Sequence, residues 1–290
     1  MSETLTFTDI EANICAVARL IEEDKLYFVQ MAGPPLMAIL MAKRMRTPNI
    51  GYVVEEGAVA PSPTFPLWPM MLGASRSHYR AVCWTGMNTV DFHASLGYMD
   101  YGVLAAIQVD RYGNLNSTIT GDSYEKPERR FGGPGGGNEI ASQCWRVIVM
   151  TKLEKRKFVE KLDFMSSPGY LDGSPGARER AGMPAGTGPY LVVTERALFG
   201  FDEKSHMLKL QAVAPWMSVE EVLARMDFKP LIADPVEELA PPTENELAIL
   251  RAEIDPGGYT LNRGEWITVE RDGSGAVRRV SRTGGKGADA

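Results

Sequence analysis

Two acidic residues follow a short apolar stretch in the first quarter of the chain. Residues 50–54 predict a buried strand, and Glu55, Glu56 and Gly57 come directly after it. Neighbouring side chains of a strand point to opposite faces, so Glu55 and Glu56 cannot face one pocket in the same way. A carboxylate held at such a strand end could act as a covalent nucleophile or as an acid–base group. Taken alone, the pattern also fits two solvated loop acids.

A glycine-rich loop follows in the middle of the chain, where residues 131–139 read FGGPGGGNE. Backbone N–H groups left bare by glycine can bind an anion or a developing oxyanion. The loop lacks the Lys and Ser/Thr of a phosphate-binding P-loop. It also does not follow a predicted strand, as the dinucleotide-binding fingerprint requires. A flexible linker is the alternative, disfavoured by the structured segments on both sides. The candidate binding residues are Gly133, Gly135, Gly136, Gly137 and Asn138, with Glu139 as a possible secondary member.

Other polar groups give weaker signals. Residues 108–116 (QVDRYGNLN) predict a strand followed by a turn, for which a structural role is the default. His78, His93 and His206 are scattered without metal-ligand spacing, and no GxSxG elbow is present, so we predict neither a metal site nor a serine nucleophile. The pair Arg129-Arg130 is predicted to be exposed.

Short apolar strands alternate with helical segments along most of the chain. This order predicts a single α/β domain over residues 1–257, with an open, mainly parallel sheet and helices on both faces. Ligands of such sheets bind at the carboxyl ends of the strands, which draws attention to the loop that begins at Glu55. The expected strands are residues 26–30, 50–54, 79–84, 103–109, 147–150 and 190–194.

Caps and turns add further elements. Thr8, Ser218 and Thr243 are expected to begin helices, the last two with a glutamate at the capping-box position. Residues 197–201 and 208–213 predict a hairpin. Residues 166–187 are rich in Gly, Pro and Ser and predict a long loop, whereas residues 258–290 predict a C-terminal tail that is partly mobile. Helices are also expected over residues 36–45 and 90–96.

Composition excludes several classes of protein. The formal net charge of −6 and the pI of about 5.3 argue against a general nucleic-acid binder. Cys15, Cys83 and Cys144 are dispersed in apolar segments and are expected to be buried, reduced thiols. The sequence shows neither a signal peptide nor an apolar run long enough for a membrane span, so we expect a cytoplasmic protein.

Five stretches, in this order, resemble the class I CoA-transferase family, in particular its glutaconate CoA-transferase B subunits. The resemblance spans about residues 8–257 of the chain. The stretches that carry it are Glu55-Glu56-Gly57 and residues 108–116, 133–141, 164–171 and 241–247.

The resemblance implies a CoA-transferase (NagB-like) fold, with the active site between this chain and an A-type partner subunit. It implies that Glu55 is the catalytic nucleophile and passes through a glutamyl-CoA thioester, stabilised by the glycine loop. Coenzyme A would be substrate and covalent intermediate, with no permanently bound cofactor. Glu56 departs from the small or polar residue usual at its position, and a neighbouring charge would raise the pKa of Glu55.

Other functions remain open from the sequence. The same fold includes a hydrolase of a cyclic β-keto acyl-CoA from steroid-ring degradation and an acyl-CoA decarboxylase, and Glu55 would then be a general base. A non-catalytic subunit that completes its partner's site is the third interpretation. The acyl group is not determined: some aromatic side chains could line an acyl pocket, although a core role is favoured. These are Trp68, Trp84, Phe92, Tyr98 and the adjacent His93.

Overall fold

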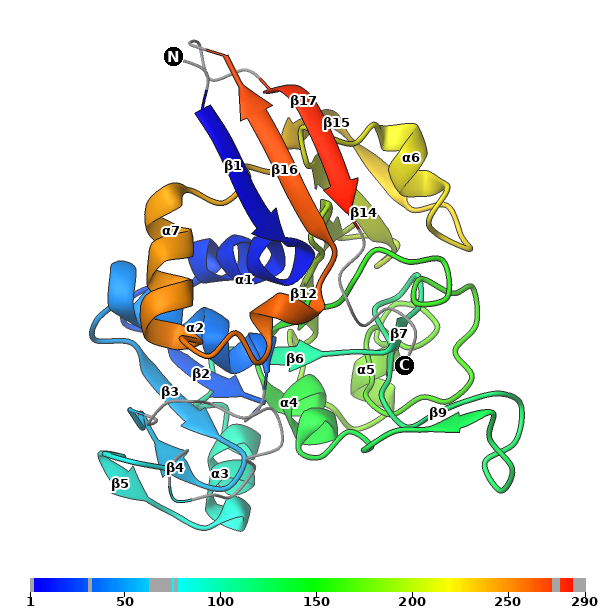
Figure 1. Cartoon of the computed structure of the whole chain (residues 1–290). Helices are drawn as coiled ribbons and strands as arrows, with labels where there is room; N and C mark the ends of the chain where they lie inside the picture. The colour runs from blue at the N-terminus through cyan, green and yellow to red at the C-terminus, as the bar shows by residue number, and fades with distance from the viewer. Residues whose placement is uncertain (1–2, 31–32, 63–74, 76–77, 273–276, 284–290) are drawn as a thin grey trace.

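A ten-stranded sheet forms the centre of the described part of the chain. The computed structural model describes residues 3–30, 33–62, 75, 78–272 and 277–283 (Figure 1). The strand order is β15-β14-β13-β12-β11-β6-β2-β3-β4-β5. These strands are β2 (Leu26–Val29), β3 (Gly51–Val54), β4 (Ala58–Val59), β5 (Cys83–Trp84), β6 (Tyr101–Ala105), β11 (Arg146–Met150), β12 (Pro189–Val193), β13 (Ala197–Phe201), β14 (Leu208–Val213) and β15 (Leu231–Glu238).

The middle of this sheet is parallel and its flanks are mixed. The five central strands, in the order β12-β11-β6-β2-β3, pair with one another in parallel. On one side of them, β4 pairs antiparallel with β3 and with β5. On the other side, β13 pairs antiparallel with β12 and with β14. The carboxyl ends of the five central strands therefore lie along one edge of the sheet. This arrangement confirms the predicted open, mainly parallel α/β sheet and the 197–213 hairpin.

Helices cover both faces of the parallel strands. α1 (Asp9–Leu20) and α2 (Pro34–Met45) pack on one face, and α3 (Met87–Ser95) and α4 (Gly137–Gln143) pack on the other. Side chains of β3 alternate between the two: Val54 lies in the core under α1 and α2, and Val53 lies in the core under α3 and α4. Burial on both faces explains why these strands are apolar along their whole length.

The predicted helix starts are confirmed by their caps. Thr8 accepts from the Glu11 backbone N–H at 3.2 Å, and the Glu11 carboxylate accepts from the Thr8 backbone N–H at 2.7 Å. The same reciprocal pair begins α6 (Val219–Leu223) at Ser218 and α7 (Glu244–Ile249) at Thr243. Each cap satisfies N–H groups that have no partner within the helix, which stabilises it by about 1 kcal/mol.

A smaller sheet lies beside α1 and α7 and joins the two ends of the described chain. β16 (Trp266–Arg271) pairs antiparallel with β1 (Glu3–Thr8) on one side and with β17 (Val277–Thr283) on the other (Figure 1). Phe7 and Ile267 of this sheet share a core with Trp216. Part of the segment predicted as a tail therefore folds into strands, preceded by a π-helical segment (Leu250–Ile254) and a 3₁₀ turn (Leu261–Arg263). The division at residue 257 stays a prediction.

Four sequence expectations differ from the structure. Of residues 79–84 only β5 is a strand, and Cys83 is exposed there, whereas Cys15 and Cys144 are buried as expected. Residues 103–109 divide between β6 and β7 (Gln108–Val109), because β7 turns away to pair with β8 (Leu115–Asn116). The 166–187 loop contains one helical turn, α5 (Ala177–Arg180), and a further short ladder joins β9 (Ile119–Thr120) to β10 (Arg129–Arg130).

Candidate functional site

Glu55 lies at the carboxyl end of β3, in the tight turn that leads to β4. Gly57 donates its N–H to the Val54 carbonyl at 2.9 Å and has a φ of +97°. A Cβ on Gly57 would lie 2.1 Å from the carbonyl oxygen of Thr85, so the turn requires glycine. Glu55 follows Val53 by two positions, which directs it to the face covered by α3 and α4.

The glycine loop lies directly against this carboxylate. A Cβ on Gly136 would lie 3.1 Å from Cγ of Glu55, and one on Gly135 would lie 3.3 Å from its Oε2. The loop can come this close to Glu55 because α4, which follows the loop, packs tightly against β6. At this contact a Cβ on Gly102 of β6 would lie 2.3 Å from Cγ2 of Ile140 on α4. Segments about 80 residues apart in sequence are thus in contact, and the structure brings together the two strongest candidates from the sequence.

The surroundings of Glu55 are acidic. Burial raises the pKa of Glu55 to about 7, and the neighbouring Glu56 carboxylate acts in the same direction. A hydrogen bond from the Gly136 backbone opposes these effects, whereas Glu139 on α4 and Asp91 on α3 add further negative charge. Oε1 of Glu55 is buried and has no hydrogen-bond partner among the described residues. The carboxyl group can therefore exchange a proton near neutral pH and has a free lone pair for chemistry.

The other members of the loop are placed differently. The N–H of Gly133 donates to the Ser117 carbonyl at 3.1 Å, and that of Gly137 donates to the Pro134 carbonyl at 2.8 Å. These two amides hold the loop in shape and are occupied in this structure. Asn138 is exposed, and its Oδ1 accepts from the Ser142 hydroxyl at 3.4 Å. Gly135 and Gly136 are accordingly the loop residues nearest to the carboxylate.

The position of His78 was not expected from the sequence, which shows it only as a histidine without metal-ligand spacing. The side chain of His78 is 4% exposed, and its Nε2 lies 4.0 Å from Oε2 of Glu56. The contact arises because β5 pairs with β4 and brings the turn before β5 back to the Glu55–Gly57 turn. No sequence spacing signals this contact, since it depends on strand pairing across more than 20 residues.

The 108–116 stretch has the structural role expected by default. The Asp110 carboxylate accepts from the backbone N–H groups of Tyr112 and Asn114, both at 2.9 Å. Asn114 in turn accepts from the N–H groups of Gly169 and Leu171 at 2.8 and 3.0 Å. These bonds fix the start of the 166–187 loop against the sheet.

Arg178, in the same loop, connects it to α4. Its buried guanidinium donates to the carbonyls of Ala141 and Ser142 at 3.0 and 3.2 Å, and to the Gly169 carbonyl at 2.7 Å. It also donates to the Thr187 hydroxyl at 3.0 Å. Burial lowers the pKa of Arg178 to about 10. The guanidinium thus caps the C-terminal carbonyls of the helix that follows the glycine loop.

The aromatic residues considered for an acyl pocket do not lie in the core. Trp84 is 65% exposed, and Phe92, His93 and Tyr98 are also exposed, so the favoured core role is wrong for them. They lie with Val82, Met87 and Leu96 on β5, α3 and the adjoining turns. Trp68 lies outside the described residues. We call the exposed set the apolar face, defined as Val82, Trp84, Met87, Phe92, Leu96 and Tyr98.

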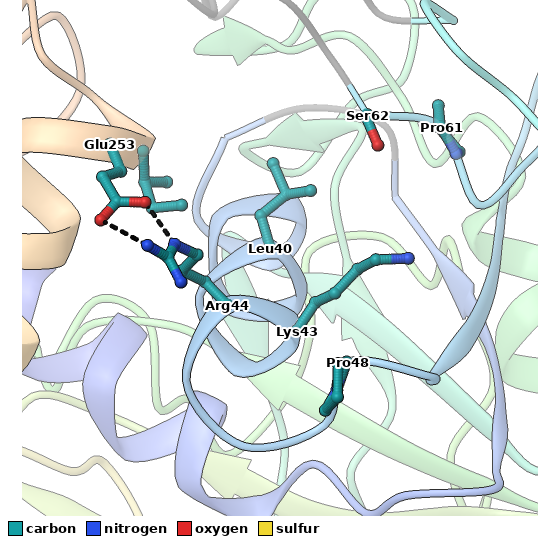
Figure 2. Close-up of a pocket in the computed structure, with 8 residues that line it drawn as sticks. Leu40, Lys43, Arg44, Pro48, Pro61, Ser62 and Glu253 are labelled. Carbon is teal, nitrogen blue, oxygen red and sulfur yellow. Dashed lines mark hydrogen bonds and ion pairs between the residues drawn. The ribbon is translucent and has the colours of Figure 1, made fainter.

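One cavity among the described residues lies away from the candidate carboxylate. It has a volume of about 320 Å³ and lies between α2 and the π-helical segment, where Arg44 forms an ion pair with Glu253 (Figure 2). Leu40 and Lys43 of α2 line it, and neither Glu55 nor the glycine loop does. Within the described ranges, no group of three or more metal-ligating side chains occurs, and no helix there is long and apolar enough to cross a membrane.

Comparison with known proteins relates this geometry to a family. The family model of coenzyme A transferases matches residues 11–225. The chain belongs to the coenzyme A transferase family. The predicted resemblance is therefore confirmed at the level of the family.

Two relatives of this CoA-transferase chain share most of its length. It is 36% identical over 262 residues to the B subunit of glutaconate CoA-transferase from Acidaminococcus fermentans, covering 89% of this chain and 96% of the relative. It is 33% identical over 239 residues to the B subunit of 3-oxoadipate CoA-transferase from Pseudomonas knackmussii, covering 82% and 89%. The crystal structure of glutaconate CoA-transferase from Acidaminococcus fermentans superposes with a TM-score of 0.77, covering 88% of this chain and 97% of that one.

Proposed function

We propose that this chain carries the catalytic glutamate of a two-subunit acyl-CoA:carboxylate CoA-transferase. The observation that carries the proposal is the contact of Glu55 with Gly135 and Gly136 at the carboxyl end of a central parallel strand. Its support is twofold: ligands of open α/β sheets bind at this edge, and the relatives that share most of the chain are named as B subunits of CoA-transferases.

The proposed reaction begins with attack of the Glu55 carboxylate on the thioester carbonyl of an acyl-CoA. The tetrahedral oxyanion collapses, CoA leaves as the thiolate, and an acyl-glutamyl anhydride remains. The thiolate then attacks the glutamyl carbonyl, which releases the acid as its carboxylate and leaves a glutamyl-CoA thioester. An acceptor carboxylate takes over the CoA by the reverse steps, and Glu55 returns to the carboxylate form.

The backbone N–H groups of the glycine loop would stabilise the negative charge of these intermediates. When the thiolate attacks the glutamyl carbonyl, the tetrahedral intermediate carries its negative oxygen on the Glu55 carboxyl carbon, and the Gly136 backbone already bonds to this carboxylate. Backbone N–H groups fixed before the reaction stabilise such charge, and loss of one donor typically costs about 10²–10³ in rate. Glu55 is half-buried in this chain, which limits the access of water to the anhydride and the thioester.

We further propose that an A-type subunit covers the apolar face. Val82 is 80% exposed and Trp84 65% exposed in the isolated chain, and both lie in the segment that pairs with the turn after Glu55. Several large apolar side chains exposed on neighbouring elements are typical of protein interfaces. A partner docked there would close the site around Glu55, which agrees with the names of the relatives as one of two kinds of subunit.

Hydrolysis of an acyl-CoA is the second candidate, and one observation favours it. A carboxyl group with a pKa of about 7 is well suited to general-base activation of water. The two reactions differ in their dependence on an acceptor acid. Transfer needs the acid and gives parallel lines in a double-reciprocal plot, whereas hydrolysis proceeds without it.

The test uses this chain purified with its copurifying partner. The complex is given acetyl-CoA, glutaryl-CoA or 3-oxoadipyl-CoA with an isotopically labelled acceptor acid, and labelled acyl-CoA is measured. Formation of labelled acyl-CoA that depends on Glu55 supports the proposal. Release of free CoA at a rate independent of the acid would replace it by hydrolysis, and unchanged transfer by Glu55→Ala would assign catalysis to the partner.

A further inference from the structure

A second group of buried polar atoms lies immediately behind Glu55. Oε2 of Glu56 and both ring nitrogens of His78 are buried, and none has a hydrogen-bond partner among the described residues. The shortest approach between them is 4.0 Å, from His78 Nε2 to Glu56 Oε2. Buried polar groups normally have partners, so this pair calls for an explanation.

Trp84 holds both members of the pair in place. Its indole N–H donates to the backbone carbonyl of Glu56 at 3.1 Å, and its ring meets the His78 imidazole edge-on at a centroid distance of 4.6 Å. The cluster therefore comprises three side chains from the β3–β4 turn, the turn before β5, and β5 itself. The fold fixes this arrangement, because the pairing of β4 with β5 places Trp84 opposite Ala58.

The charges around the nucleophile show what the pair can do. The groups that face Glu55 are Glu56 from its own turn, Asp91 from α3 and Glu139 from α4, and all three are acidic. Among the described residues, no Lys or Arg forms an ion pair with Glu55 or Glu56; the basic group within 4.0 Å of either is His78. Attack on a thioester requires the ionised form of Glu55, which this acidic environment disfavours.

We propose that His78 is a positioning residue whose imidazolium neutralises Glu56, so that Glu55 is available as the carboxylate nucleophile. This inference rests on the proposed function of Glu55. His78 acts through Glu56 and does not itself contact the substrate. With two N–H donors, the imidazolium can satisfy the buried Glu56 oxygen after a small approach of the two side chains.

The direction of the expected shift in the pKa of Glu55 follows from the charges of His78 and Glu56. Loss of the imidazolium leaves Glu56 uncompensated and raises the pKa of Glu55 further, whereas loss of the Glu56 charge lowers it. Because His78 acts through Glu56, its removal has no further effect once Glu56 is neutral. The proposal therefore predicts non-additive shifts, which a merely structural role of His78 does not.

The experiment measures the protonation of Glu55 directly. The complex with its partner subunit is treated at a series of pH values with a water-soluble carbodiimide and glycine ethyl ester, which modify protonated carboxyl groups. Peptide fragmentation then assigns the label to Glu55 rather than Glu56. We expect the labelling midpoint to rise by about one pH unit in His78→Gln and to fall by about one in Glu56→Gln. The double variant should match Glu56→Gln, and His206→Gln, which removes a remote imidazole stacked on Tyr170, should match the wild type.

Two results would overturn the proposal. An unchanged midpoint in His78→Gln would show that the imidazole does not act on Glu55, and an equal shift in the Glu56→Gln background would show that it does not act through Glu56. The labelling needs no turnover, so the outcome is separate from that of the proposed function. If the midpoints shift as expected while no variant transfers CoA, the electrostatic inference stands and the transferase mechanism fails.

Discussion

The Cα of Gly136 faces the side chain of Glu55 so closely that a methyl group on it would lie 3.1 Å from Cγ of the glutamate. This is tighter than an ordinary van der Waals contact, and it ties the glycine loop to the carboxylate geometrically. The loop therefore has two functions at one position. It provides an N–H donor to the carboxylate, and it sets the direction in which the carboxylate points.

Gly136→Ala should displace the carboxylate by a few tenths of an ångström and lower the rate of CoA transfer about ten- to hundredfold. The φ of Gly136 is −73°, which alanine readily adopts, so the fold should tolerate the change. Initial rates of the complex with acetyl-CoA and a labelled acid measure the effect.

The matched control is Gly132→Ala in the same loop, where a Cβ would meet no atom within 4 Å. We expect it to retain wild-type rates. Equal losses in the two variants would mean that the loop matters through its flexibility and not through its contact with Glu55.

The transfer rate should depend on pH through Glu55. The proposed reactive form is the carboxylate, and burial beside Glu56 raises the pKa of Glu55 to about 7. The rate should therefore be level above about pH 8 and fall about tenfold for each pH unit below about 6. Single-turnover formation of the enzyme–CoA adduct, measured from about pH 5 to about pH 9, gives this profile. A rate that stays constant across the whole range would contradict the assigned protonation.

The same pKa predicts a pH-dependent effect on stability. The folded-state pKa of about 7 lies above the ordinary value of 4.5, so the ionised group disfavours folding above pH 7 and this cost disappears as the pH falls towards 4.5. Glu55→Gln should raise the free energy of unfolding by about 1–3 kcal/mol at about pH 8, and by much less at about pH 5. Urea titrations of both proteins at the two pH values measure the difference. An equal effect at both would exclude a buried, ionising Glu55.

Arg178→Ala should destabilise the chain by about 2–4 kcal/mol, because it leaves the carbonyls of Ala141, Ser142 and Gly169 buried without this donor. Arg180→Ala is the control, since Arg180 lies two positions further in α5 and is exposed. Thermal unfolding of the two variants should differ clearly. Similar melting temperatures would show that the guanidinium is not needed to join α4 to the 166–187 loop.

Val82→Glu should weaken association with the partner subunit at least about tenfold, corresponding to about 1.4 kcal/mol, because it places a charge within the apolar face. The side chain is 80% exposed, so the isolated chain should remain folded. Ile232→Glu on β15 is the comparison, an exposed apolar residue on the strand at the opposite end of the main sheet. Copurification and sedimentation of the complex measure association. Normal assembly of Val82→Glu would place the partner elsewhere.

Local signals in the sequence predict those parts of the fold that depend on neighbouring residues. The capping boxes at Ser218 and Thr243, the hairpin of β13 and β14, and the apolar run of β3 are confirmed at or close to their predicted bounds. The caps and the hairpin join residues close in sequence, and the apolar run of β3 is visible in its own residue types, so local patterns identify all three.

Features that depend on contacts between segments far apart in the sequence could not be predicted from it. β1 and β16 are more than 250 residues apart, and neither has a signal that names its partner. His78 reaches Glu56 only through the pairing of β4 with β5. The sequence favours a core role for Trp84, Phe92 and Tyr98 because aromatic residues are usually buried, whereas all three are exposed in the isolated chain. The residue pattern singles out Glu55 and the glycine loop separately, and only the family resemblance places the loop at Glu55.

A covalent glutamyl-CoA intermediate can be detected in the mass of this chain after incubation of the complex with acyl-CoA and no acceptor acid. We predict an increase equal to CoA minus one water, located on Glu55 by peptide mapping and absent in Glu55→Gln. Treatment with an acceptor carboxylate should remove the adduct and regenerate acyl-CoA. Steady release of free CoA without any adduct on the wild-type chain would contradict the proposed glutamyl-CoA thioester.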